Sequence, residues 1–91
     1  MTGTKVCVLA GRTGAEEFSL LEKYARQGCA IAIMEKNKKM GEMLKEELQK
    51  LYDIPVFFFH GDSHSEEDRE IFFAAVNEMY GGADFIICQN N

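Results

Sequence analysis

Short apolar runs alternate along the chain with longer stretches in which apolar residues recur every three or four positions. The runs are Val6 to Ala10, Cys29 to Met34, Val56 to Phe59 and Phe85 to Cys88. Each is apolar at nearly every position, which is typical of strands in a parallel sheet that helices cover on both faces. The pattern predicts a single α/β domain over residues 1–91, with four strands and three helices.

Turn and cap residues place the helices between these runs. The first helix ends before Gly28, the second begins near Asn37, a good N-cap, and the third begins at Ser65 with a capping-box pattern that runs to Asp68. The apolar stripes that should face the sheet are Phe18, Leu21 and Ala25, then Met40, Met43, Leu44, Leu48 and Leu51, then Ile71, Phe72, Phe73, Ala75, Val76, Met79 and Tyr80. We expect the Met40 and Met43 pair to pack in the core.

Right-handed crossovers between parallel strands then determine the topology. They predict strand order 3-2-1-4 in three layers, with the first two helices on one face of the sheet and the third alone on the other. That second face should be thinly covered, and the run from Phe85 to Cys88 should form an open edge with no lysine or proline to block pairing. We therefore expect a homodimer that buries the third helix, the bare sheet face or the strand-four edge, over about 1,200 Å² or more.

Charge and cysteine usage exclude several classes of partner. The formal net charge is -5 and there is no basic stripe, which argues against nucleic acid. No apolar run approaches the ~18 residues of a membrane span. Cys7, Cys29 and Cys88 lie in apolar runs without a Cys-x-x-Cys spacing, which favours buried, reduced thiols in a cytoplasmic protein, although Cys88 could also be a reactive thiol at a strand end.

Four segments carry a recognisable pattern. They are Lys5-Val6-Cys7-Val8-Leu9-Ala10-Gly11, the acid Glu35, His60-Gly61-Asp62, and Gly81-Gly82-Ala83-Asp84-Phe85-Ile86-Ile87. Together they resemble the short-chain dehydrogenase/reductase family, and the resemblance spans nearly the whole chain. It implies a Rossmann-like half-domain, the N-terminal part of an NAD(P)-binding fold.

The glycine-rich turn of that family, T-G-x-x-x-G-x-G, is matched here at one glycine. Its threonine falls on Ala10 and its three glycines fall on Gly11, Ala15 and Glu17. The register G-x-x-G-x-x-G of the extended and atypical branches keeps Gly11 and Gly14, and again places Glu17 at the last glycine. Since Glu16 and Glu17 bring negative charge to the first helical turn, where a diphosphate would bind, we expect NAD or NADP binding to be weak or lost.

The resemblance also assigns single residues to cofactor binding. Glu35 matches the acid that binds the ribose, Lys36 the position where a base selects a 2′-phosphate, and Asp62 the aspartate beside the adenine. The full set of candidate cofactor-binding residues is Gly11, Arg12, Thr13, Gly14, Glu35, Lys36, Asp62 and Ser63. From the residues alone, Glu35 and Asp62 are also ordinary turn residues, and Lys36 belongs to a solvated helix start.

No catalytic residue is predicted. The family's serine and Tyr-x-x-x-Lys pair have no counterpart, because the positions four residues after Tyr24, Tyr52 and Tyr80 hold Gly28, Val56 and Asp84. The N-N-A-G segment appears as Cys88-Gln89-Asn90-Asn91, without its glycine. We therefore expect a truncated, non-catalytic half-domain that self-associates. The alternatives are a binding module for NAD(P) or an adenine nucleotide, and one segment of a split oxidoreductase.

His60, Asp62 and His64 raise the question of a metal site. Their spacing is that of a loop, and no third strong ligand can be placed beside the two histidines from sequence. Ordinary polar residues at a strand end and a helix start are the preferred interpretation, and no metal site is predicted.

Overall fold

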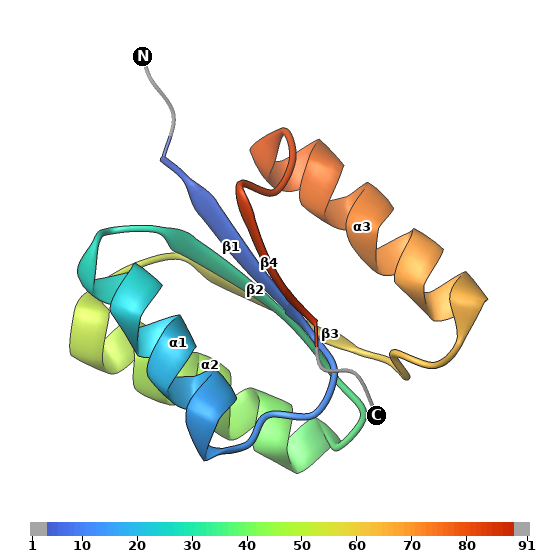
Figure 1. The fold of residues 1–91 in the computed structure, drawn as a ribbon, viewed down its shortest axis with the longest axis horizontal. Coiled ribbons are helices and arrows are strands. Elements are labelled where there is room, and N and C mark those ends of the chain that lie inside the picture. Colours follow the sequence, from blue (N-terminus) through green and yellow to red (C-terminus); the bar gives the residue numbers. More distant parts are fainter. Residues whose placement is uncertain (1–3, 89–91) are drawn as a thin grey trace.

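The computed structural model describes residues 4–88, with Cys88 placed by its backbone only, and shows a sheet between two helical layers (Figure 1). The elements are β1 (Val6–Ala10), α1 (Ala15–Arg26), β2 (Ala30–Glu35), α2 (Lys38–Tyr52), β3 (Val56–His60), α3 (Glu66–Tyr80) and β4 (Phe85–Cys88). The strands form one parallel sheet of order β3-β2-β1-β4. The predicted class and strand order are confirmed.

Side chains at the helix starts explain where α2 and α3 begin. The Asn37 side chain accepts a hydrogen bond from the Met40 amide at 3.0 Å, and the Ser65 hydroxyl accepts one from the Asp68 amide at 3.2 Å. The capping box predicted for α3 is only half formed, because the Asp68 carboxylate accepts from the Asp62 amide at 2.9 Å. None of the helices between residues 4 and 88 is long and apolar enough to cross a membrane.

Alternate residues of the strands face two separate hydrophobic clusters. The cluster under α1 and α2 includes Cys7, Leu9, Ile31, Ile33 and Val56 from the sheet, with Leu21, Ala25, Leu44 and Leu48 from the helices. The cluster under α3 contains Val6, Val8, Ala10, Ala30, Ala32 and Met34, with Phe72 and Val76. This division matches the strand period of two, and it explains why both faces of β1 and β2 are apolar in the sequence.

The bare sheet face predicted beneath α3 is not found over β1 and β2. Their six residues on this face are at most 6% exposed. One helix suffices because the large Phe72 ring, which packs against Phe57, Phe59 and Phe73, fills the space between α3 and the small alanine side chains of the sheet. The exposed remainder is Ile86 of β4, which lies beside Val8 in the parallel register and is 55% exposed.

The prediction that Met40 and Met43 pack in the core is wrong. Their side chains are 41% and 56% exposed, because the buried face of α2 is a narrow stripe of Gly41, Leu44 and Leu48. Gly41 brings this stripe close to the sheet. A Cβ atom built at Gly41 would lie 2.1 Å from the Phe58 ring, so the contact leaves no room for a side chain.

The buried thiols make stability sensitive to alkaline pH. Cys7 is fully buried, and burial raises the pKa of its thiol from 9.0 to about 12; burial also raises the pKa of Cys29. The unfolded chain therefore loses these protons first, so stability is complete below about pH 9 and falls as the pH rises towards 12. Urea unfolding at pH 8, 9 and 10 should show a fall of up to about 1.4 kcal/mol per pH unit from each such group.

The variant Cys7→Ala is the control for this dependence, because it removes the more strongly shifted thiol. Its free energy of unfolding should depend less steeply on pH between 9 and 10 than that of the unmodified protein. Equal slopes in the two proteins would show that the Cys7 thiol does not titrate as its burial requires.

Candidate functional site

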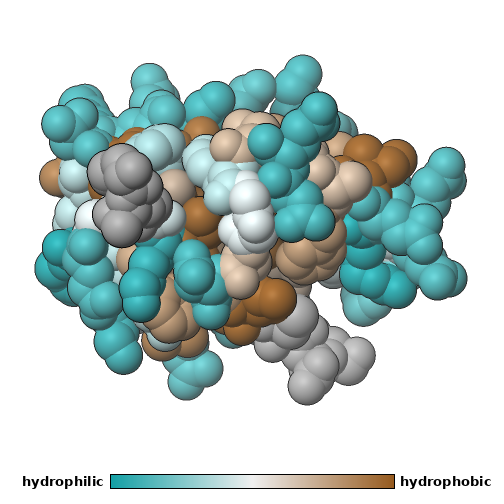
Figure 2. Space-filling model, turned by 90° about the horizontal axis from the view of Figure 1, so that it is seen from above, coloured by the Kyte–Doolittle hydropathy of each residue, from teal (hydrophilic) through white to brown (hydrophobic). Residues whose placement is uncertain are grey.

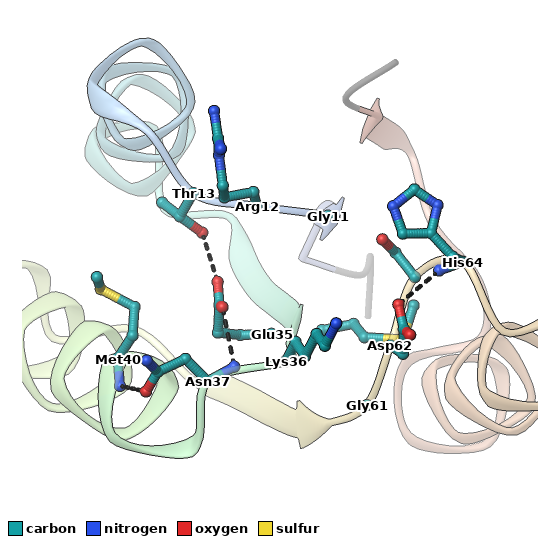
Figure 3. A pocket seen from close by; sticks show the side chains of 12 residues that line it. Gly11, Arg12, Thr13, Glu35, Lys36, Asn37, Met40, Gly61, Asp62 and His64 are labelled. Carbon is teal, nitrogen blue, oxygen red and sulfur yellow. Dashed lines mark hydrogen bonds between the residues drawn. The ribbon is translucent and has the colours of Figure 1, made fainter. Parts of the chain in front are cut away.

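A cleft of about 650 Å³ lies where β1, β2 and β3 end, beside the start of α2 (Figure 3). Of the eight residues predicted to bind a cofactor, seven line it: Gly11, Arg12, Thr13, Glu35, Lys36, Asp62 and Ser63. The eighth, Gly14, lines a smaller neighbouring hollow with Phe18, Met40 and Met43. The fold thus brings together residues from three loops. The two that are furthest apart in the sequence, Gly11 and Ser63, are separated by 52 positions.

Glu35 is the buried charge of the cleft. At 6% exposure it is the one charged side chain that is buried among residues 4–88. Its Oε2 atom accepts a hydrogen bond from the Asn37 amide at 3.0 Å, and Oε1 accepts from the Thr13 hydroxyl at 3.4 Å (Figure 3). Buried carboxylates need such donors, and these two hold the group against the first loop.

The loop after β3 is held to β2 and to α3. The Gly61 amide donates to the carbonyl of Glu35 at 3.2 Å, and the Asp62 amide donates to the Asp68 carboxylate at 2.9 Å. Asp62 Oδ1 accepts from the His64 amide at 2.9 Å, so this side chain does form the turn that the sequence allowed. Asp62 nevertheless lines the cleft opposite Glu35, and Lys36 extends between the two acids (Figure 3).

The loop between β1 and α1 contains two glycines, and the second is hydrogen-bonded to the first turn of α1. Gly11 is buried and has φ 136°, a backbone conformation that glycine adopts readily. Gly14 is the N-cap of α1 and carries no capping side chain, and its amide donates to Glu17 Oε1 at 2.9 Å. The sequence identified Glu17 as an added negative charge, whereas the structure shows its carboxylate hydrogen-bonded to the loop itself.

Sequence reasoning missed five residues that line the cleft: Met34, Asn37, Met40, Gly61 and His64. Asn37 follows Glu35 by two positions and is a strong N-cap, so its amide could have been placed near the acid. Met40 stands one turn into α2 and lines both hollows. Its exposure, unforeseen in the sequence, gives the cleft an apolar side wall.

The candidate metal ligands do not converge. The His60 ring lies with Nε2 3.0 Å from the carbonyl oxygen of Lys36, and His64 is exposed. Within the described part of the chain, no three His, Cys, Asp or Glu side chains are grouped so that they could hold a metal ion. The Cys88 side chain and the segment 89–91, which the sequence compares with N-N-A-G, lie outside the described residues.

Two solved structures match this fold closely. L-sorbose reductase from Gluconobacter frateurii, solved with NADPH and L-sorbose, matches 98% of the chain with a TM-score of 0.88 and 19% sequence identity. NAD⁺-bound xylitol dehydrogenase matches 92% of the chain with a TM-score of 0.83 and 24% identity. The chain has the fold of part of these two enzymes, and this is the fold that the resemblance to short-chain dehydrogenases/reductases implied. The expected Rossmann-like fold is confirmed.

The likeness covers only part of the length of these enzymes. The chain spans about one third of the matched proteins, 34% of the sorbose reductase and 32% of the xylitol dehydrogenase. No protein-family model and no curated protein matches the sequence. At these identities the structural likeness establishes the fold.

Proposed function

We propose that this chain is a non-catalytic Rossmann half-domain that binds the adenine-nucleotide part of a ligand in the cleft at the ends of β1, β2 and β3. The observation that carries this proposal is the buried carboxylate of Glu35, held at the cleft by Thr13 and Asn37. In parallel α/β sheets, ligands bind at the carboxyl ends of the strands. A fixed acceptor at that position suits the hydroxyl groups of a ribose.

NAD(P) fits this cleft only in part. Both matched structures were solved with a nicotinamide dinucleotide, and the acids Glu35 and Asp62 fit the ribose and adenine of such a ligand. The diphosphate position does not fit, since Ala15 and Glu17 replace glycines and Glu17 accepts the Gly14 amide. We therefore expect dinucleotides to bind weakly.

We propose no redox activity for this chain on its own. Its 91 residues contain no Tyr-x-x-x-Lys pair. If a separate chain supplied the remainder of a split oxidoreductase, the two together could be catalytic, and the one-third coverage of the matched enzymes supports testing that alternative. The free thiols of Cys7 and Cys29 support our proposal of a reducing, cytoplasmic location.

The variant Glu35→Gln tests nucleotide binding directly. Glutamine keeps the shape of the side chain but removes the charge, so AMP affinity measured by calorimetry should fall about ten-fold. Glu46→Gln, an exposed residue of α2 outside the cleft, is the matched control and should leave the affinity within about two-fold. Equal affinity in Glu35→Gln and the unmodified protein would remove Glu35 from the site.

Self-association is a second proposed property, supported by the exposed apolar surface at β4. This strand lies at one edge of the sheet, and its Ile86 side chain is 55% exposed on the α3 face. Figure 2 shows hydrophobic residues at the surface near the middle of the view, with hydrophilic residues around them. An open edge strand with an apolar side chain favours pairing with a second copy.

Sedimentation equilibrium at micromolar concentration should therefore show a dimer. Ile86→Lys should weaken it at least about ten-fold, because the interface would then bury an unpaired charge. Leu51→Lys changes a leucine of similar exposure, 57%, on α2 in the other helical layer, and should have little effect on the dimer. A monomer throughout this concentration range would contradict the proposal.

A further inference from the structure

We infer that Glu17 acts as a built-in substitute for the ligand's diphosphate, so that the cleft selects nucleosides without a 5′-diphosphate, such as adenosine, over ADP and dinucleotides. The inference rests on the proposed nucleotide-binding function and names the ligand class for it. The selection would come from one side chain, whose hydrogen bond with the Gly14 amide the sequence did not reveal.

The contact that carries the inference is the hydrogen bond from the Gly14 amide to Glu17 Oε1, at 2.9 Å. In Rossmann folds the diphosphate is bound by backbone amides at the N-terminus of the first helix. Gly14 is the N-cap of that helix here, and its amide already donates to a carboxylate. A diphosphate would have to displace Glu17 to reach this amide, and would then meet its negative charge at short range.

The charged side chains near Glu17 also disfavour an anionic ligand. Glu16 adds a second carboxylate to the first turn of α1, and it is exposed. Arg12 is exposed as well, and in Figure 3 its side chain extends away from Glu35 and Asp62. The first turn therefore presents acids to the place where an anion would bind, which disfavours a diphosphate.

The cleft itself, which lies beside this turn, is lined by hydrogen-bond acceptors. Glu35 and Asp62 offer hydrogen-bond acceptors from two different loops. Carboxylates pair with donors, and an adenosine supplies two ribose hydroxyls and an exocyclic amine. An uncharged nucleoside can therefore use these acceptors without bringing negative charge to α1.

The test is a calorimetric titration of the whole chain with adenosine, AMP and ADP. Adenosine should bind more tightly than ADP to the unmodified protein. Selectivity, the ratio of the Kd for ADP to the Kd for adenosine, should fall at least about five-fold in Glu17→Ala, which removes the carboxylate. Glu17→Gln keeps an acceptor for the Gly14 amide while removing the charge, so it should show a smaller fall and protects the test if the alanine variant folds poorly.

Glu16→Gln is the matched control, since it removes an equal charge from the same turn and should change selectivity less than about two-fold. Tighter binding of ADP than adenosine to the unmodified protein, or an equal effect of the Glu16 and Glu17 variants, would overturn the role of Glu17 while leaving the cleft as a nucleotide site. If no nucleoside or nucleotide binds to any variant, the nucleotide site itself is refuted and this inference with it.

Discussion

Replacing Phe72 with alanine is expected to lower the free energy of unfolding by about 3–5 kcal/mol. Phe72 is fully buried and is the largest such side chain among residues 4–88. Its ring packs against Phe57, Phe59 and Phe73, with centroids 5.2–6.1 Å apart. Because α3 is the sole helix on this face of the sheet in the described part of the chain, the cavity would open in the contact that holds the layer in place.

Urea unfolding followed by circular dichroism measures this loss. Domains of this length are stable by roughly 5–14 kcal/mol, so the variant should be partly unfolded or have a much lower midpoint. Phe73→Ala is the control, because its ring is only half-buried beside the same cluster and should cost less. Equal losses for the two variants would show that α3 does not cover the sheet as described.

The second large effect is expected at Gly41, where alanine should lower the free energy of unfolding by about 1–3 kcal/mol. In an ordinary helix the same change would add about 1 kcal/mol, because alanine is the better helix former. Here the new Cβ atom would overlap with the Phe58 ring, so we expect steric repulsion to outweigh the gain in helix propensity and the protein to be less stable.

A double-mutant cycle with Phe58→Ala separates the two effects. Once the ring is removed, Gly41→Ala should become neutral or stabilising, and the coupling between the two changes should exceed about 1 kcal/mol. A stabilising Gly41→Ala in the unmodified protein would mean that α2 does not approach β3 this closely.

The strand pattern was sufficient to predict the fold because the inner strands β1 and β2 are apolar almost throughout and buried throughout, with the partly exposed β3 and β4 at the edges. Runs such as Val6 to Ala10 are apolar on both faces, and both faces are buried. Crossover handedness then left one arrangement of α1, α2 and α3. The helix ends were also predictable, because they depend on neighbouring residues in the sequence. Gly28, just after α1, has φ 86°, as expected for a glycine at that position.

What the sequence did not reveal depends on distances between elements. Met40 and Met43 fit an apolar stripe by spacing, but only the close contact between Gly41 and Phe58 shows how α2 is rotated towards the sheet. Likewise, the cluster of phenylalanine rings around Phe72 allows one helix to cover a face that appeared to need two.

For the candidate site, too, the positions of the residues could be predicted from the sequence but most of their hydrogen bonds could not. Strand ends are predictable, so seven of the eight proposed residues line one cleft. Hydrogen bonds within loops are not, because they depend on side-chain rotamers. The bonds of Glu35 with Thr13, and of Glu17 with Gly14, could be seen only in the structure.

The most direct test of the nucleotide site is a titration of the ¹⁵N-labelled chain with adenosine, followed through its backbone amide resonances. Gly11, Thr13, Asn37 and Gly61 line the cleft, and their amide resonances should shift together with one saturation curve. The amide of Glu78, on the exposed surface of α3, should not move. Saturable shifts centred on α3 or β4, or none at saturating adenosine, would contradict a nucleotide site at the ends of β1, β2 and β3.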